Sequence, residues 1–153
     1  MTGNNDHQPK PLDLDDVLLE KRLPRLPTQV IDGPSQYIQS LPGKGIRNKV
    51  IDTLNLWFAV PEPSIQVIKK IIDLLHQASL MLDDIQDSSS LRRGKPSTHT
   101  IFGLPQTLNS SSYKIAEALE EVLKLDNVNC MRVVIGKLAP QHRCQTHRSI
   151  LTF

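Results

Sequence analysis

The sequence predicts a helical protein, because apolar residues recur at helix spacing in each of its three patterned stretches. These stretches cover about residues 44–60, 63–87 and 110–125. Between the first two, Pro61 is expected to end one helix and Pro63 to begin the next. No run of about 18 apolar residues is present, so no membrane span is expected.

Length and composition narrow the class of protein. The chain has 153 residues, of which 39% are hydrophobic and 22% are charged, as in an ordinary soluble domain. Its net charge of +2 gives no reason to expect a nucleic-acid partner or a membrane surface. The first residues lack the apolar core of a signal peptide, and two cysteines are too few for a disulfide scaffold. A cytoplasmic location is therefore expected.

Three regions differ in composition. Residues 1–33 are polar, acidic and interrupted by prolines, and we expect a poorly ordered arm with a solvated acidic face. Residues 34–125 hold the predicted helices, the last of which is expected to be capped by Asn109 or Ser110. Residues 126–153 form a divergent tail whose cysteines and histidines match none of the usual zinc spacings. These are Cys130, His142, Cys144 and His147.

The second predicted helix ends in the acidic motif LMLDDIQD, over residues 80–87. Asp83 and Asp87 are one helical turn apart and share a helix face with His76. Buried carboxylates are costly unless a cation offsets their charge. Oxygen ligands one turn apart suit Mg²⁺, which keeps some waters and shares phosphate oxygens with a substrate. The motif predicts a magnesium site, the alternative being an acidic helix end exposed to solvent.

Two basic clusters flank this acidic motif in the sequence. Lys44 and Arg47 lie in the first turn of the first predicted helix, beside free backbone N–H groups and the positive end of the helix dipole. Arg92 and Arg93 follow the acidic motif in a turn that contains glycine and proline. Guanidinium groups bind phosphate oxygens in a bidentate manner. The arrangement predicts binding of a metal–phosphate pair, the alternative being a network of ion pairs in a loop.

With this order and spacing, the motifs resemble those of short-chain trans-prenyl diphosphate synthases, in particular fungal geranylgeranyl diphosphate synthases. The similar text covers roughly residues 33–127: LPGKGIRNKVIDTLNLWFAVP, LLHQASLMLDDIQDSSSLRRGKPSTHTIFGLPQTLNSSSY and ALEEVLKLD. The resemblance implies an all-α fold, here the N-terminal helices of the isoprenoid-synthase fold in incomplete form. It also implies a prenyltransferase with Mg²⁺ as cofactor, in a family that forms homodimers. The substrates would be isopentenyl diphosphate and an allylic diphosphate (dimethylallyl, geranyl or farnesyl diphosphate).

The same resemblance assigns roles to individual residues. Asp83 and Asp87 would ligate Mg²⁺ at the allylic diphosphate, Asp84 would support them, and Arg92 would contact that diphosphate. The catalytic set would thus be Asp83, Asp84, Asp87 and Arg92. The isopentenyl diphosphate site would comprise Lys44, Arg47, His76 and Arg93.

Product length in this family is limited by side chains that precede the acidic motif. Here those residues are Ala78 and Ser79, and no aromatic ring blocks the cavity at either position. A twenty-carbon product is therefore expected rather than a fifteen-carbon one.

The sequence departs from this family after about residue 127. No second aspartate-rich motif follows, because the only acids beyond Asp87 are Glu117, Glu120, Glu121 and Asp126. We therefore expect a truncated chain that is marginally stable and has little or no activity alone. Two other interpretations stay open. One is a class I terpene cyclase, which ionises allylic diphosphates without an isopentenyl site, and the other is a non-catalytic fragment or partner subunit.

Overall fold

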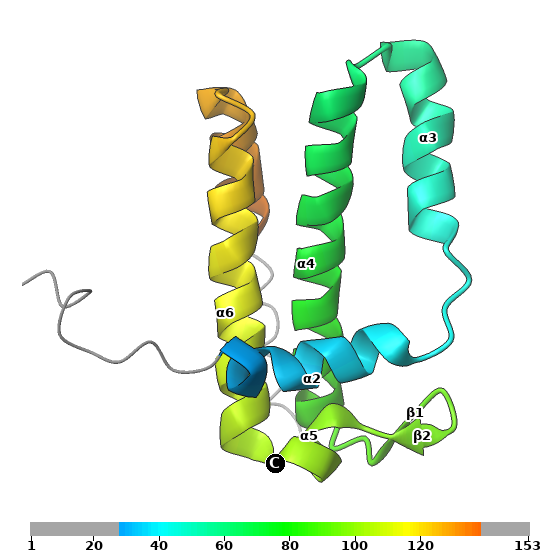
Figure 1. The fold of residues 1–153 in the computed structure, drawn as a ribbon, viewed down its shortest axis with the longest axis vertical. Coiled ribbons are helices and arrows are strands. Elements are labelled where there is room, and N and C mark those ends of the chain that lie inside the picture. The colour runs from blue at the N-terminus through cyan, green and yellow to red at the C-terminus, as the bar shows by residue number, and fades with distance from the viewer. Residues whose placement is uncertain (1–27, 139–153) are drawn as a thin grey trace, which may run out of the picture.

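The computed structural model describes residues 28–138, which form a bundle of helices with one short hairpin (Figure 1). The helices are α2 (Thr28–Ser40), α3 (Ile46–Phe58), α4 (Glu62–Gln86), α5 (Thr98–Phe102), α6 (Leu104–Leu123) and a helix over residues 128–138. Strands β1 (Leu91–Arg92) and β2 (Lys95–Pro96) pair in antiparallel fashion between α4 and α5. The predicted all-α fold is confirmed. Within the described residues, no helix is long and apolar enough to cross a membrane.

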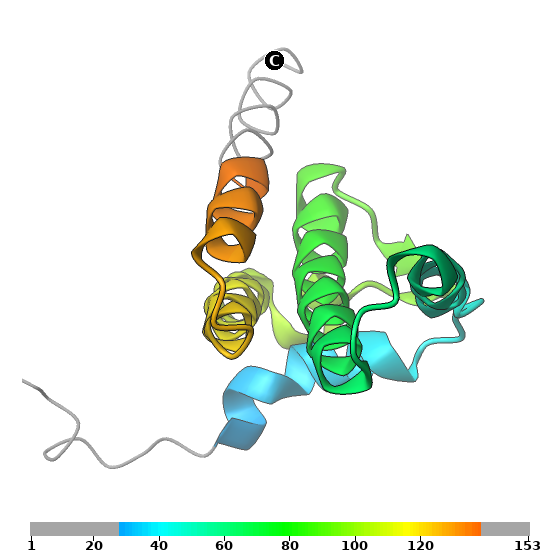
Figure 2. The same ribbon diagram turned by 90° about the horizontal axis from the view of Figure 1, so that it is seen from above.

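Helices α4 and α6 form the centre of the bundle and lie side by side in both views (Figures 1 and 2). Their apolar faces meet through four buried residues, Ile71, Leu74, Ala118 and Val122. A second cluster joins α2 to α4, because Ile38 and Leu41 pack against the fully buried Met81. Helix α2 therefore crosses the bundle near the end of α4 that carries the acidic motif (Figure 1).

The last predicted helix starts earlier than expected. Helix α6 begins at Leu104, and its N-cap is Gly103 at φ 80°, so the predicted cap at Asn109 or Ser110 is wrong. Pro105 occupies the first turn, where its missing N–H costs nothing. The next turn carries small polar residues, Thr107, Ser110 and Ser111, which are all buried. Because these residues bury no apolar side chain, the hydrophobic periodicity does not reveal this part of the helix.

Both ends of the described region extend the predicted helical segment. Helix α2 begins at Thr28 and contains Pro34, which removes one helical hydrogen bond and masks the helix in the sequence. At the other end, the helix over residues 128–138 packs onto the α4–α6 core through Cys130, Met131 and Val134. The other zinc candidates considered in the sequence, at 142, 144 and 147, lie outside the described residues.

Helix α3 stands apart from α4 (Figure 1) and buries none of its residues. Its apolar stripe is instead exposed, at 57% for Ile46 and 79% for Trp57. The helix ends at Phe58, two residues before the predicted end, where the Asn55 side chain makes two hydrogen bonds with the backbone of Val60. Its attachment to α4 is therefore largely polar.

The β1–β2 hairpin is anchored to α2 by Tyr37. The Tyr37 hydroxyl donates a hydrogen bond to the carbonyl oxygen of Pro96 (2.7 Å), and its ring meets that of Phe102 edge-on, with 6.0 Å between centroids. We expect Tyr37→Phe to lower the free energy of unfolding by about 0.5–1.5 kcal/mol, because it removes one hydrogen bond and keeps the ring. Urea denaturation measures this. Tyr113→Phe is the control, since no hydrogen bond to that hydroxyl is found within the described residues, and an equal loss in both variants would contradict the assignment.

Candidate functional site

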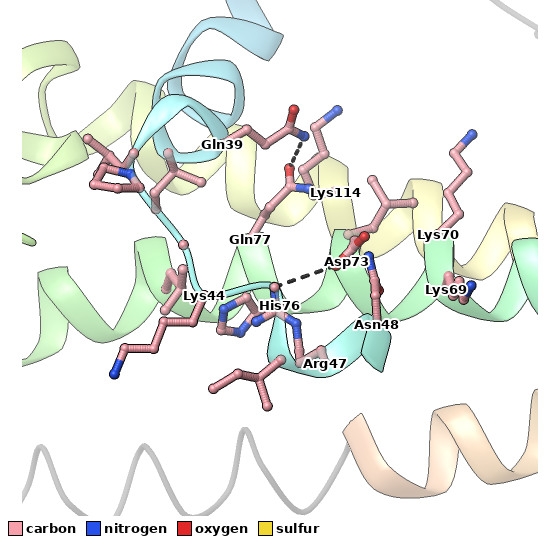
Figure 3. Close-up of a pocket in the computed structure, with 18 of the residues that line it drawn as sticks. Gln39, Lys44, Arg47, Asn48, Lys69, Lys70, Asp73, His76, Gln77 and Lys114 are labelled. Atoms are coloured by element: carbon pink, nitrogen blue, oxygen red, sulfur yellow. Dashed lines mark hydrogen bonds and ion pairs between the residues drawn. The ribbon is translucent and has the colours of Figure 1, made fainter. Parts of the chain in front are cut away.

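A cavity of about 1150 Å³ lies between α2, α3 and α4. Its lining includes all four residues expected at the isopentenyl diphosphate site: Lys44, Arg47, His76 and Arg93. They come from separate elements: the loop before α3, the first turn of α3, the middle of α4 and the hairpin. Figure 3 shows the first three gathered at one part of the cavity. The structure thus brings together side chains that are up to 49 residues apart in the sequence (93 − 44).

The loop that carries Lys44 is held by two glycine positions and one arginine. Gly45 adopts φ 62°, which allows the chain to turn directly into α3. The Arg93 guanidinium donates from Nη1 to the carbonyl oxygens of Leu41 (3.2 Å) and Pro42 (2.6 Å). A Cβ at Gly43 would lie 3.2 Å from that same Nη1, so glycine permits this close approach. Arg93 therefore fixes the loop beside the hairpin.

Three further lysines line the cavity, and the sequence reasoning missed them. Each is paired with an acid: Lys69 with Asp52 (2.5 Å), Lys70 with Glu121 (2.7 Å), and Lys114 with both Asp32 and Glu117 (2.8 Å each). By contrast, Lys44 and Arg93 have no carboxylate partner within residues 28–138, and Arg47 meets Asp73 at 3.5 Å between partly exposed groups. The unbalanced positive charge, which an anion would neutralise, is therefore concentrated at the Lys44 end.

His76 lies in the middle of α4 and faces this positive charge. Burial, followed by the guanidinium groups of Arg47 and Arg93, lowers the pKa of His76, while Asp73 acts in the opposite direction. The imidazole is thus neutral at pH values where a solvated histidine is protonated. A neutral ring can both donate and accept a hydrogen bond.

The lowered pKa of His76 gives a testable pH dependence. In the unfolded chain the pKa is about 6.5, so below this pH the unfolded state binds more protons than the folded state. The free energy of unfolding should therefore fall as the pH is lowered through and below about 6.5. We expect His76→Gln to remove this contribution, which urea denaturation between pH 7.5 and 5.5 measures. Identical pH slopes for the two proteins would contradict the assignment.

The acidic motif at the end of α4 contains a buried ion pair. Asp84 is 2% exposed and forms a bidentate pair with Arg92, at 2.7 Å from Nε to Oδ2 and 2.7 Å from Nη2 to Oδ1. This hydrogen bonding raises the pKa of Arg92. Because a guanidinium has five N–H donors, Arg92 keeps three for another anion. Asp84 therefore orients Arg92, which is compatible with the supporting role expected for it.

Asp83 and Asp87 are the remaining carboxylates of the motif. Asp83 is partly buried and Asp87 is exposed, one turn further along the chain, with the Asp87 N–H bonded to the Asp83 carbonyl oxygen (2.8 Å). Within the described residues, no group of three or more acids, histidines or cysteines is placed to hold a metal. A pair of carboxylates nevertheless fits Mg²⁺ that completes its shell with water and phosphate oxygens. Magnesium ligation by this pair therefore stays a prediction, in which a bound diphosphate would have to supply the remainder of the shell.

Ala78 and Ser79 line a second, mainly apolar cavity of about 400 Å³. It lies between α4, α6 and the helix over residues 128–138. Arg47 and His76 line this cavity as well as the larger one, so the two cavities share a boundary at these side chains. The structure therefore places the residues expected to govern product length beside an apolar space that adjoins the basic cavity.

Comparison with known proteins identifies the family. Residues 28–147 match the family model described as polyprenyl synthetase. This match extends twenty residues past residue 127, where the resemblance in the sequence was expected to end. Preasperterpenoid A synthase PvPS of Talaromyces verruculosus is 51% identical over 125 residues, which are 82% of this chain and 16% of that protein. Geranylgeranyl pyrophosphate synthase cle6 of Aspergillus versicolor is 48% identical over 118 residues, which are 76% and 31% of the two chains. Bifunctional sesterterpene synthase astC of Talaromyces wortmannii is 48% identical over 125 residues, which are 82% and 17%.

The chain therefore spans less than a third of the length of these relatives. The residues that match the family model contain the basic cavity, the acidic motif and the apolar cavity described above. A family match over residues 28–147 covers most of the 153 residues. The chain belongs to the polyprenyl synthetase family.

Proposed function

We propose that this chain serves a prenyltransferase reaction of the geranylgeranyl diphosphate synthase type, in which isopentenyl diphosphate condenses with an allylic diphosphate. The observation that carries the proposal is the convergence of Lys44, Arg47, His76 and Arg93 on one cavity. An allylic diphosphate alone needs one phosphate site, whereas a condensation needs two. The acidic motif and Arg92 provide the second site, next to the first along the hairpin.

Each group has a distinct task in this proposal. Lys44, Arg47 and Arg93 bind the diphosphate of the isopentenyl substrate, and the neutral His76 supplies a further hydrogen bond. Asp83 and Asp87 would hold Mg²⁺, which when bound would supply positive charge to a leaving diphosphate. Arg92, oriented by Asp84, adds guanidinium charge at the same group. With both diphosphates held, the isopentenyl double bond would lie close to the allylic carbon.

A class I terpene cyclase is the second candidate, because two of the relatives named above are terpene synthases by name. A cyclase ionises its substrate without an isopentenyl site, so it gives no role to the unbalanced charge of Lys44 and Arg93. The basic cavity therefore favours the prenyltransferase, and the cyclase becomes an outcome of the test.

The test combines binding with product analysis. Calorimetric titration should show that isopentenyl diphosphate binds and that inorganic diphosphate competes with it. This binding measurement decides the test, because a chain with one aspartate-rich motif is expected to have low turnover. When radiolabelled isopentenyl diphosphate is incubated with farnesyl diphosphate and Mg²⁺, any product that forms should be a labelled allylic diphosphate. Absence of isopentenyl diphosphate binding would overturn the proposal. Conversion of the allylic diphosphate to an unlabelled cyclic hydrocarbon would establish the cyclase instead.

A further inference from the structure

The start of α3 is not held beside the larger cavity by its own packing. None of the residues of α3 is buried. Its two ion pairs with α4 run through Arg47 and Asp52, whose side chains are 46% and 58% exposed, and such exposed pairs contribute little to stability. Lys44 and Arg47 nevertheless have to lie at fixed places if they bind one diphosphate. Another element must therefore hold this part of the chain.

The β1–β2 hairpin is that element, because it lies on the same side of α4 as α3 in both views (Figures 1 and 2). Arg93, at its tip, donates from Nη1 to the carbonyl oxygens of Leu41 (3.2 Å) and Pro42 (2.6 Å), which directly precede the loop that carries Lys44. The guanidinium has five N–H donors, so three remain on Nε and Nη2 for an anion. One side chain can therefore hold the loop and still face the diphosphate.

The backbone at the tip of the hairpin is unusual for an arginine. Arg93 and Gly94 form the two-residue turn between the paired residues Arg92 and Lys95. Their φ angles are 53° and 75°, and a type I′ turn requires positive φ at both positions. Asparagine or aspartate is preferred at the first position, whereas a long side chain rarely adopts positive φ. The arginine is therefore explained by what its side chain holds and not by the turn.

We propose that Arg93 is a positioning residue, which sets the loop of residues 41–45 and, through this loop, the places of Lys44 and Arg47. The inference rests on the proposed function for the identity of the anion. It gives Arg93 a task besides contact with the diphosphate, and it gives the hairpin the task of fixing a helix that has no core contacts of its own.

Gly43→Ala tests this contact without changing any charge. A Cβ at Gly43 would lie 3.2 Å from Nη1 of Arg93, which is closer than an ordinary van der Waals contact, so the guanidinium has to move relative to the two carbonyl oxygens. The dissociation constant for inorganic diphosphate, measured by calorimetric titration, should rise roughly two- to tenfold, as for the loss of one hydrogen bond. Gly136→Ala is the matched control and should change nothing, since a Cβ there meets no atom within 4 Å and the residue does not line the cavity.

Arg93→Asn separates the positioning role from folding. Asn-Gly is a preferred pair for a type I′ turn, so the urea midpoint of this variant should be equal to or above that of the native chain. Its dissociation constant for inorganic diphosphate should nevertheless rise at least about tenfold, because both the loop contact and the direct contact are lost. Lys95→Met removes a charge from the same hairpin outside the cavity lining and should leave this constant unchanged. Equal losses of affinity in the two variants would overturn the inference.

The double variant Gly43→Ala with Arg93→Asn shows whether the two residues act through one another. If the Cβ at position 43 acts by displacing Arg93, it should have no further effect once the arginine is absent. Gly43→Ala weakening diphosphate binding equally in the native and Arg93→Asn chains would overturn the inference, because the Cβ would then act on the anion directly. Native affinity of the single variant Gly43→Ala would overturn it as well.

Amide hydrogen exchange separates this inference from the proposed function, because it needs no ligand. In the free chain, Gly43→Ala and Arg93→Asn should each speed the exchange of the α3 amides and leave those of α4 unchanged. If they do so while the native chain binds neither inorganic nor isopentenyl diphosphate, the proposed function fails and the positioning role stands. If diphosphate binds and neither variant changes exchange in α3, the positioning role fails and the proposed function stands.

Discussion

Replacing Arg92 with methionine is expected to lower the free energy of unfolding by about 3–5 kcal/mol, because it leaves a buried charge without its partner. The Asp84 side chain is only 3% exposed, and Arg92 supplies both hydrogen bonds to its two oxygens. The opposite change, Asp84→Leu, should cost less, since the 21% exposed Arg92 side chain can turn toward water. Urea denaturation of both variants measures the asymmetry.

Two controls accompany this prediction. Lys95→Met removes a positive charge from an exposed position of the same hairpin and should change the free energy of unfolding by no more than about 0.5 kcal/mol. The double variant Asp84→Leu with Arg92→Met should recover much of the loss, because no unpaired charge remains buried. If the double variant lost as much free energy of unfolding as the two single variants lose together, the structural account would be contradicted.

The second large effect concerns anion binding. Arg47→Gln is expected to weaken the binding of inorganic diphosphate by roughly 10–100-fold, because a charge-assisted hydrogen bond contributes about 1.5–3 kcal/mol. Lys49→Gln is the matched control, since Lys49 lies in the same helix, is exposed and does not line the cavity. Calorimetric titration at fixed ionic strength measures both. Equal losses would show that the anion responds to the overall charge of α3 rather than to the cavity.

Much of the basic site was predictable because helix periodicity fixes which residues share a face. Lys44 and Arg47 are three residues apart at the start of a helix, so both could be placed on one side. His76 was predicted to share a face with Asp83, and the structure puts it at the cavity. The convergence of α3, α4 and the hairpin depends on tertiary packing, so only the resemblance to a known family could supply it.

Other features lay beyond local pattern. The Asp84–Arg92 pair depends on the path of the hairpin, which folds Arg92 back onto α4 eight residues later. The extra turns of α6 pack small polar residues, and the helix over residues 128–138 follows a change in composition, so neither gave a periodic signal. On α3 the apolar stripe predicted the helix itself but gave no information on its burial, because a regular apolar face does not guarantee burial.

The exposed position of α3 has a thermodynamic consequence for the ligand that Arg47 binds. A 13-residue helix without buried residues is marginal by itself, and the ion pairs Lys69–Asp52 and Arg47–Asp73 tie it to α4. Opening of α3 should therefore require less free energy than opening of α4, and its amide hydrogens should exchange sooner. Part of the free energy of anion binding then goes into holding α3 against α4, which lowers the observed affinity. Added salt weakens binding twice, by screening the anion and by loosening the element that carries its arginine.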